Sequence, residues 1–238
     1  MLFDAFGTLI TLHKPVRSLV AALEEVGAPN PPSAVASAFL TEVAYYRRKQ
    51  DTGGDAASLA ALRRQCAEVF CSTLPNPPSV TDATRVLVDS LPYQAYDDAI
   101  PALGRLRAAG VAVAVVSNFD VSLGEVLEDT GLAPYVDVTV ASAVVGARKP
   151  DPAIFAVALD RLGVPASAAL HCGDRRDEDG EGALAAGIRP VLLQRDDVTE
   201  DDENPAFAVV SDLGRVVDLA LGDSDALATV GGSVSPSE

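Results

Sequence analysis

Four side chains in this sequence have the types and spacing to act together on an anionic group. Asp4, Ser117 and Asp174 each stand at or just after the end of a short apolar run, and Lys149 lies in a loop segment between the last two. A carboxylate that can act as nucleophile, a hydroxyl donor, an ammonium group and a further carboxylate that can bind a metal are the groups that phosphoryl transfer needs. The reason is that the transferred group carries negative charge on three oxygens.

The elements that would position these side chains alternate between strands and helices. Strands are expected at residues 111–116, 136–141, 168–172 and 190–193, after a first short strand that ends at Asp4. Helices are expected at residues 99–109, 123–130, 152–162 and 181–186. This order predicts an α/β fold with a Rossmann-like parallel sheet flanked by helices. In such a sheet the carboxyl ends of the strands share one edge, where ligands bind.

A helical insertion separates the first strand from the rest of the sheet. Apolar residues recur at helical spacing from about residue 16 to residue 90, with proline-rich breaks between the helices and no strand. We therefore expect a core domain of residues 1–12 and 95–222 and an inserted all-helical domain of residues 13–94. Residues 223–238 are rich in Gly and Ser without periodicity, which predicts a disordered tail.

The charge of the chain excludes two classes of partner. The formal net charge is −16, from 18 Lys and Arg against 34 Asp and Glu. Nucleic acids and anionic membranes bind clustered basic residues, so neither is expected as a partner. The sequence has no signal-peptide pattern and no apolar run of about 18 residues, which predicts a cytoplasmic location. We expect a small-molecule substrate, and the oligomeric state stays open.

Four segments, in order along the chain, resemble the signature of the haloacid dehalogenase (HAD) superfamily of hydrolases. They are Asp4-Ala5-Phe6-Gly7-Thr8-Leu9, Val116-Ser117-Asn118-Phe119-Asp120, Lys149-Pro150-Asp151-Pro152-Ala153-Ile154-Phe155, and Gly173-Asp174 with Asp179 five residues on. One such segment is a weak indication, but four in order beside fitting strands are a strong one. The helical insertion resembles the C1 cap of subclass I members, which covers the site and selects the substrate.

The resemblance implies a role for each matching residue. Asp4 would be the nucleophile and would form an aspartyl-phosphate that water then hydrolyses. Thr8 would orient the loop that carries Asp4. Ser117 would donate a hydrogen bond to a phosphoryl oxygen, Lys149 would neutralise both Asp4 and the incoming anion, and Asn118 would contact the substrate.

The resemblance also implies a Mg²⁺ site. Asp4, Asp174 and the backbone carbonyl of Phe6 would hold the ion with oxygen ligands, and Asp179 would support them from behind. Without a cation, carboxylates gathered at one strand edge would repel each other and raise their own pKa values.

Phe6 departs from the pattern of the superfamily's phosphatases. They usually carry a second Asp two residues after the nucleophile, as general acid for the leaving oxygen and then base for water, and a phenyl ring can do neither. Haloacid dehalogenases place an aromatic residue there, so a metal-free 2-haloacid dehalogenase stays open, as does a protein that binds phosphorylated ligands without turnover. Asp174 favours a Mg²⁺-dependent phosphatase of a small phosphorylated metabolite, because a second uncompensated carboxylate would repel a haloacid. The ring of Phe6 would then contact that substrate.

The remaining reactive residue types receive structural interpretations. His171 lies inside a strand and is expected to be a hydrogen-bonded core residue. His13, where the chain leaves the core, is also interpreted as structural, although it is the first candidate to replace the missing acid. The basic run of Arg47, Arg48 and Lys49 is expected to be solvated. The three cysteines are spaced neither as a metal site nor as a disulfide framework and are expected to be thiols.

The first strand is short for its expected central place. Only three residues precede Asp4, whereas strands commonly have five or six. The α-amino group of Met1 would then lie near the buried middle of the sheet, at a cost in free energy. We therefore expect the natural chain to start upstream.

Overall fold

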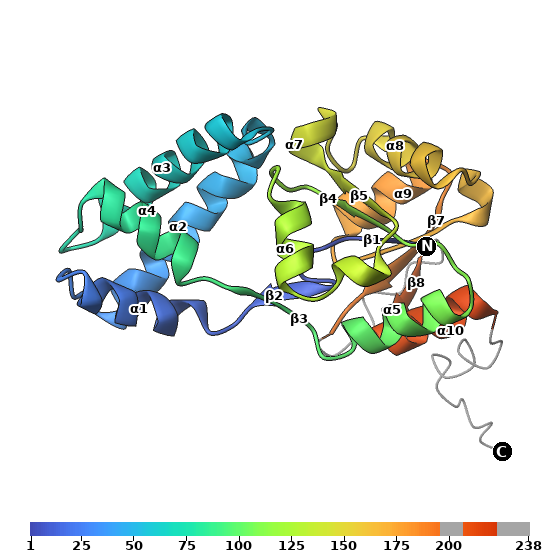
Figure 1. Cartoon of the computed structure of the whole chain (residues 1–238), viewed down its shortest axis with the longest axis horizontal. Helices are drawn as coiled ribbons and strands as arrows, with labels where there is room; N and C mark the ends of the chain where they lie inside the picture. The colour runs from blue at the N-terminus through green and yellow to red at the C-terminus, as the bar shows by residue number, and fades with distance from the viewer. Residues whose placement is uncertain (196–206, 223–238) are drawn as a thin grey trace, which may run out of the picture.

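The computed structural model describes residues 1–195 and 207–222, and its centre is a six-stranded parallel sheet (Figure 1). The strand order is β5-β4-β1-β6-β7-β8. The strands are β1 (Leu2–Phe3), β4 (Ala114–Ser117), β5 (Val138–Ala141), β6 (Leu170–Gly173), β7 (Arg189–Leu193) and β8 (Ala208–Val210). The expected Rossmann-like sheet is confirmed, and β1 lies near its middle, so the residues that follow β1, β4 and β6 meet at one edge.

Helices cover both faces of this sheet. Successive strand residues point to opposite faces. Phe3 therefore packs with α5 and α10, and the neighbouring Leu2 packs with α8 on the other side. The helices of the sheet domain are α5 (Ala99–Ala108), α6 (Leu123–Asp129), α7 (Ser142–Val145), α8 (Pro152–Leu162), α9 (Gly182–Ala185) and α10 (Leu213–Leu221).

Four further helices form a lobe beside the sheet domain (Figure 1). They are α1 (Pro15–Glu25), α2 (Pro32–Lys49), α3 (Ala56–Thr73) and α4 (Val80–Asp89), with a short helical turn η1 (Gln50–Thr52) after α2. The lobe has its own apolar core, in which Leu23, Phe39 and Phe70 pack together. Where the chain leaves and re-enters the sheet domain, β2 (Ile10–Leu12) pairs antiparallel with β3 (Tyr93–Ala95). We propose that this lobe, residues 13–94, is the cap.

The strand expected at residues 111–116 begins three residues later than expected. Gly110 follows the end of α5 and has a φ of 71°. The N–H of Val111 donates to the carbonyl of Leu106, and the N–H of Gly110 donates to the carbonyl of Arg107. This is the hydrogen-bond pattern of a Schellman helix end. Val111 therefore caps α5 instead of pairing in the sheet.

The segment before α9 also differs from the expectation of a helix at residues 181–186. A π-helical turn, η4 (Arg176–Glu181), precedes α9 and takes up the first residue of that range. Turns of this kind often occur at functional sites. Here the turn carries Asp179 back toward the strand edge, as described below.

The α-amino group of Met1 is partly buried. It donates a hydrogen bond to the carbonyl of Ala112 at 2.7 Å, and burial lowers its pKa although Asp137 lies nearby. An upstream start of the natural chain stays a prediction. The expected disordered tail, residues 223–238, lies outside the described residues. Among the residues that are described, no helix is long and apolar enough to span a membrane.

Candidate active site

Asp4 lies at the carboxyl edge of the sheet and accepts hydrogen bonds from two predicted site residues, Lys149 and Ser117. Lys149 donates from Nζ to Asp4 Oδ1 at 2.6 Å, and Ser117 donates from Oγ to the same oxygen at 3.0 Å. The N–H of Asp4 continues the ladder by bonding to the carbonyl of Cys172 at 2.8 Å. Ser117 and Lys149 lie 113 and 145 residues after Asp4 in the sequence, and all three side chains meet at the predicted sheet edge.

Lys149 bridges Asp4 to a second buried carboxylate. Its Nζ also lies 2.5 Å from Asp179 Oδ1, which contacts His171 Nε2 at 2.9 Å, while the N–H of Arg175 donates to Asp179 Oδ2 at 3.1 Å. Asp179 packs directly over Gly173, where an added Cβ would lie only 2.1 Å from its Cγ. Both Asp179 oxygens are therefore occupied by protein donors, which fits a supporting position behind Asp4.

The charges of this cluster follow from its burial and its pairing. Burial lowers the pKa of the Lys149 ammonium, but Asp179 and Asp4 outweigh it and raise that pKa above its ordinary value. Burial raises the pKa of Asp179, yet Lys149 and His171 outweigh it and hold that pKa well below its ordinary range. Burial lowers the pKa of His171. Lys149 is thus positively charged, Asp179 negatively charged and His171 neutral at pH 7.

Asp174 completes a group of oxygens suited to a hard cation. One carboxylate oxygen each of Asp4, Asp174 and Asp179 lie within 4.8 Å of one another. Asp174 Oδ2 lies so close to the loop after Asp4 that a Cβ on Gly7 would be 2.4 Å away. Burial raises the pKa of Asp174 to about 7, and the charges of Asp4 and Asp179 add to the shift.

These residues fit a divalent cation. Asp4 Oδ1 is used by Lys149 and Ser117, whereas no described residue donates a side-chain hydrogen bond to Asp4 Oδ2 or to Asp174. Burial also raises the pKa of Asp4 against the opposing charge of Lys149. The expected mutual rise of the carboxylate pKa values is therefore found at Asp4 and Asp174 but not at Asp179. Free oxygens that converge and repel each other are what a bound Mg²⁺ would neutralise.

Asn118 contacts the backbone of Lys149. The N–H of Lys149 donates to Asn118 Oδ1 at 2.7 Å, and Asn118 Nδ2 donates to the Lys149 carbonyl at 3.0 Å and to Glu178 Oε2 at 2.9 Å. These bonds occupy the amide that was expected to contact substrate. Asn118 therefore positions Lys149, and its contact with substrate stays a prediction.

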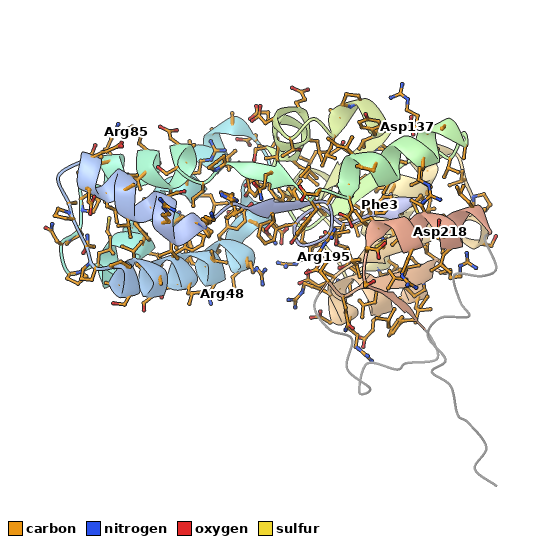
Figure 2. The ribbon with its side chains drawn as sticks, turned by 90° about the horizontal axis from the view of Figure 1, so that it is seen from below. Phe3, Arg48, Arg85, Asp137, Arg195 and Asp218 are labelled. Atoms are coloured by element: carbon orange, nitrogen blue, oxygen red, sulfur yellow. The ribbon has the colours of Figure 1, made fainter. Side chains whose placement is uncertain are left out.

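Thr8 is buried on the far side of the nucleophile loop. Its hydroxyl has no hydrogen-bond partner among the described residues, and its carbonyl accepts from Arg195 Nη2 at 2.8 Å. Arg195 also forms two bonds of 3.0 Å with the carboxylate of Asp98, and its guanidinium lies 3.8 Å above the ring of Tyr96. Figure 2 labels Arg195 where the helical lobe meets the sheet domain. Arg195 thus holds the loop after β1 through the backbone carbonyl of Thr8 and not through the Thr8 side chain.

A cavity of about 970 Å³ opens from Asp4 toward the helical lobe. Its walls come from α2, α3, α4 and β3 on the side of the lobe and from the loops after β1, β4 and β6 on the side of the sheet. The ring of Phe6 lines it and packs edge-on against Tyr93, with ring centroids 6.3 Å apart. A small molecule can therefore contact Asp4 and the lobe at once.

A family model for haloacid dehalogenase-like hydrolases matches residues 1–187. The chain belongs to this family. The HAD hydrolase is 34% identical to a ribulose-1,5-bisphosphate 5-phosphatase of Halopiger xanaduensis over 189 residues, which cover 72% of this chain and 77% of the relative. It is also 40% identical over 105 residues to haloacid dehalogenase-like hydrolase domain-containing protein 3 of Danio rerio, where the match covers 44% of this chain and 43% of the relative. The chain thus spans less than half the length of the Danio rerio protein.

A solved structure shows that the HAD hydrolase shares its fold with a dehalogenase. The L-2-haloacid dehalogenase from Xanthobacter autotrophicus superposes with a TM-score of 0.66 at 21% identity, over 93% of this chain and 97% of that one. At this identity the likeness concerns the fold alone.

The described wall of the cavity in this HAD hydrolase contains no histidine. His13 is exposed, whereas His171 is buried, as expected, and packs edge-on against the ring of Phe155 at 4.9 Å. Arg47 and Arg48 are exposed, and both reach the cavity wall. The structure therefore gives no position at the site to His13, the first candidate to replace the acid missing at Phe6.

The sequence motifs of the HAD hydrolase did not select two residues that contact the site, Arg195 and Glu42. Arg195 follows β7, so the strand-end rule that selected Asp174 could also have selected it. Glu42 lines the cavity from α2, and its buried neighbours on that helix are Val35, Ala38 and Phe39. A spacing of three and four residues between them predicts one helix face, so an acidic residue on an apolar face was the available signal.

Proposed function

We propose that the chain is a Mg²⁺-dependent phosphatase that acts on a small phosphorylated metabolite through an aspartyl-phosphate on Asp4. The observation that carries this proposal is the pair of carboxylates, Asp4 and Asp174, whose free oxygens converge beside a buried Lys149. An anionic ester can approach such a pair only when positive charge neutralises it. The phosphatase named among the relatives supports the same reaction class.

The first half-reaction would use Asp4, Lys149 and Ser117 together with bound Mg²⁺. Asp4 attacks the phosphorus, the bond from phosphorus to the ester oxygen breaks, and the leaving oxygen takes a proton from water. Lys149 has three N–H donors, of which Asp4 and Asp179 use two, so the third is available to a phosphoryl oxygen. Ser117 is placed to donate to the phosphoryl group beside Asp4. Bound Mg²⁺, held by Asp4, Asp174 and the Phe6 carbonyl, would supply neutralising charge at the phosphoryl oxygens.

The second half-reaction restores the enzyme. Water attacks the phosphorus of the aspartyl-phosphate, inorganic phosphate leaves with the proton balance closed by solvent, and Asp4 returns to its ionised form. Phe6 cannot remove a proton from that water, so this step lacks the general base of other family phosphatases.

A 2-haloacid dehalogenase remains the second candidate because of Phe6. Its ring lines the cavity beside Asp4, as an aromatic residue does in the dehalogenases, and Asp4 could displace a halide from carbon in the same way. Asp174 argues against this reaction, because its carboxylate would repel the carboxylate of a haloacid.

The two candidates differ in their need for metal. Purified protein is assayed against alkyl phosphates, aryl phosphates, acyl phosphates and 2-haloacids, each with Mg²⁺ and with a chelator. We expect phosphate release that stops with chelator and returns with Mg²⁺. Asp4→Asn should abolish turnover, and the exposed Asp89→Asn on α4 serves as a control that should retain it. Halide release that persists in chelator would favour the dehalogenase instead.

A further inference from the structure

A buried carboxylate projects into the cavity from the helical lobe. Glu42 of α2 is only 8% exposed and lines the cavity. No N–H or O–H of a described residue donates to it, and its hydrogen-bond partner is the thiol of Cys66, a weak donor. Burial raises the pKa of Glu42. Burial disfavours the ionised form of a carboxylate that has neither a cation nor strong donors, and a cation bound beside it would restore that form.

The surroundings of Glu42 are rich in acceptors. Asp120 is 4% exposed; its Oδ2 accepts from the hydroxyl of Tyr46 at 2.7 Å, and its Oδ1 accepts from the N–H and the hydroxyl of Ser122 at 2.8 and 2.6 Å. Burial and then the charges of Glu42 and Asp120 raise the pKa of Cys66. Burial and then Asp120 and Glu42 raise the pKa of Tyr93 in the same way. Both carboxylates therefore act on the same thiol and the same phenol, and we call Glu42, Tyr46, Cys66, Tyr93 and Asp120 the acidic pocket.

One described cation lies near the acidic pocket. Arg63 lines the same cavity and its charge lowers the pKa of Tyr93, but no ion pair joins it to Glu42 or Asp120 within the described residues. The other arginines of the wall are either exposed or paired, as Arg148 is with Asp51 at 2.9 Å. The pocket is therefore a concave group of acceptors that favours a positively charged ligand.

The walls of the pocket suit a cation as well. The rings of Tyr93 and Phe119 lie 5.8 Å apart and both line the cavity. Aromatic faces attract ammonium groups, and apolar walls such as Phe39 and Leu62 exclude water, which strengthens the attraction between opposite charges.

The acidic pocket lies within reach of a molecule bound at Asp4. Asp120 follows Ser117 by three residues, which span at most about 10 Å of extended chain. The hydroxyl of Ser117 is 3.0 Å from Asp4 Oδ1. A short leaving group attached to a phosphoryl group at Asp4 can thus place its far end between Asp120 and Glu42.

We propose that the acidic pocket binds an ammonium group on the leaving group of the substrate, so that, among alkyl phosphate monoesters, those of amino alcohols are preferred over neutral ones of equal length. The proposal rests on the proposed phosphatase function. Glu42 pairs with the ammonium, Asp120 and the aromatic rings surround it, and the phosphoryl group lies at Asp4 and Lys149.

The test compares esters that differ in one charge. The probes are 2-aminoethyl phosphate and 4-aminobutyl phosphate, each with its neutral counterpart of equal length, propyl phosphate and pentyl phosphate. We expect the parent to favour at least one amino ester over its counterpart by tenfold or more in kcat/KM. Glu42→Gln should remove most of this preference, measured as the ratio of kcat/KM for each amino ester to that for its neutral counterpart. Glu68→Gln, an exposed acid on α3, should alter neither ratio.

Two outcomes overturn the proposal while the phosphatase function stands. One is a parent that hydrolyses the amino and neutral esters equally well at both lengths, a result that does not depend on any variant. The other is a Glu42→Gln variant that slows all four esters alike, which would make Glu42 structural. If none of the esters, and no aryl phosphate, is hydrolysed with Mg²⁺, the proposed function fails. The thermal shift of the parent and Glu42→Gln with 2-aminoethyl phosphate against propyl phosphate then decides whether the pocket binds an ammonium group.

Discussion

The side-chain amide of Asn118 brackets the backbone of Lys149, accepting from its N–H at 2.7 Å and donating to its carbonyl at 3.0 Å. Because Lys149 contacts both Asp4 and Asp179, this amide fixes the ammonium group of the lysine against both carboxylates. The family resemblance predicts a contact of Asn118 with the substrate, which stays a prediction, and the structure adds its contacts with Lys149.

Asn118→Ala should therefore lower kcat by about tenfold or more with a smaller change in KM. It should also lower the free energy of unfolding by about 1–3 kcal/mol, the usual range for lost hydrogen bonds. Asn30→Ala is the matched control, since Asn30 makes comparable backbone bonds at Asn76 within the helical lobe. It should lower stability to a similar extent and leave kcat unchanged. Equal losses of kcat in both variants would contradict the positioning role.

Lys149→Met should make stability depend on pH in the opposite sense from the parent. In the parent, the lowered pKa of Asp179 contributes stability above the ordinary carboxyl pKa, and this contribution is lost as the pH falls. Without the ammonium, Asp4 and Asp179 are buried and have no opposite charge beside them, which should cost about 3–5 kcal/mol near pH 7.5. The cost should shrink at pH 5, where the carboxyls can take up protons. Urea unfolding at both pH values measures it, with the exposed Lys49→Met as control. A loss of the same size at both pH values would count against this account.

Mg²⁺ binding should weaken as the pH falls below about 7. The pKa of Asp174 is raised to about 7, so the carboxyl binds a proton below that value, and the proton competes with the ion. The affinity for Mg²⁺ should then fall by up to about tenfold for each pH unit below 7. Calorimetric titration with Mg²⁺ at pH 6, 7 and 8 measures it. Asp174→Asn should bind weakly at every pH, and Asp177→Asn, at an exposed position, should behave like the parent.

Substrates with good leaving groups should be preferred because Phe6 offers no proton. General acid catalysis is commonly worth about 10²–10⁴-fold, so aryl phosphates should be hydrolysed much faster than alkyl phosphates. The missing base should also slow the second half-reaction, and the aspartyl-phosphate should accumulate in acid-quench experiments. Phe6→Asp should speed alkyl ester hydrolysis and abolish the accumulation, whereas Phe6→Leu should do neither. Loss of the ring contact with Tyr93 should lower stability in both variants. A parent that hydrolyses alkyl and aryl esters at equal rates would mean that another group supplies the proton.

Arg195→Lys should loosen the sheet-domain side of the two chain crossings, because Thr8 and Tyr96 flank β2 and β3. An ammonium cannot reproduce the paired bonds to Asp98 together with the bond to the Thr8 carbonyl and the stacking on Tyr96. Hydrogen exchange should quicken in β2 and β3, where the two crossings pair, and kcat should fall more than KM rises. Arg85→Lys in the helical lobe, whose pair with Asp82 is exposed, is the control. Unchanged exchange in β2 and β3 would contradict the role of Arg195 as a clamp.

The sequence by itself determined the sheet edge and most of the residues on it. Asp4 and Asp174 follow strands and Ser117 ends one, these strands are parallel neighbours, and parallel strands present their carboxyl ends together whatever fills the rest of the fold. The α/β alternation and the helical lobe followed from hydrophobic periodicity alone, because that signal lies in neighbouring residues.

Only the tertiary structure decided which side chains pair. The residue at which a strand begins depends on which residues the neighbouring strands pair with. β4 pairs with β1 and β5 only from Ala114 onward, and Val111 instead bonds to the end of α5. The assembly of Glu42 with Asp120, and of Arg195 with the Thr8 carbonyl, joins segments far apart in the chain. Contacts of this kind depend on how the packed elements meet in space, and no spacing in the sequence records them.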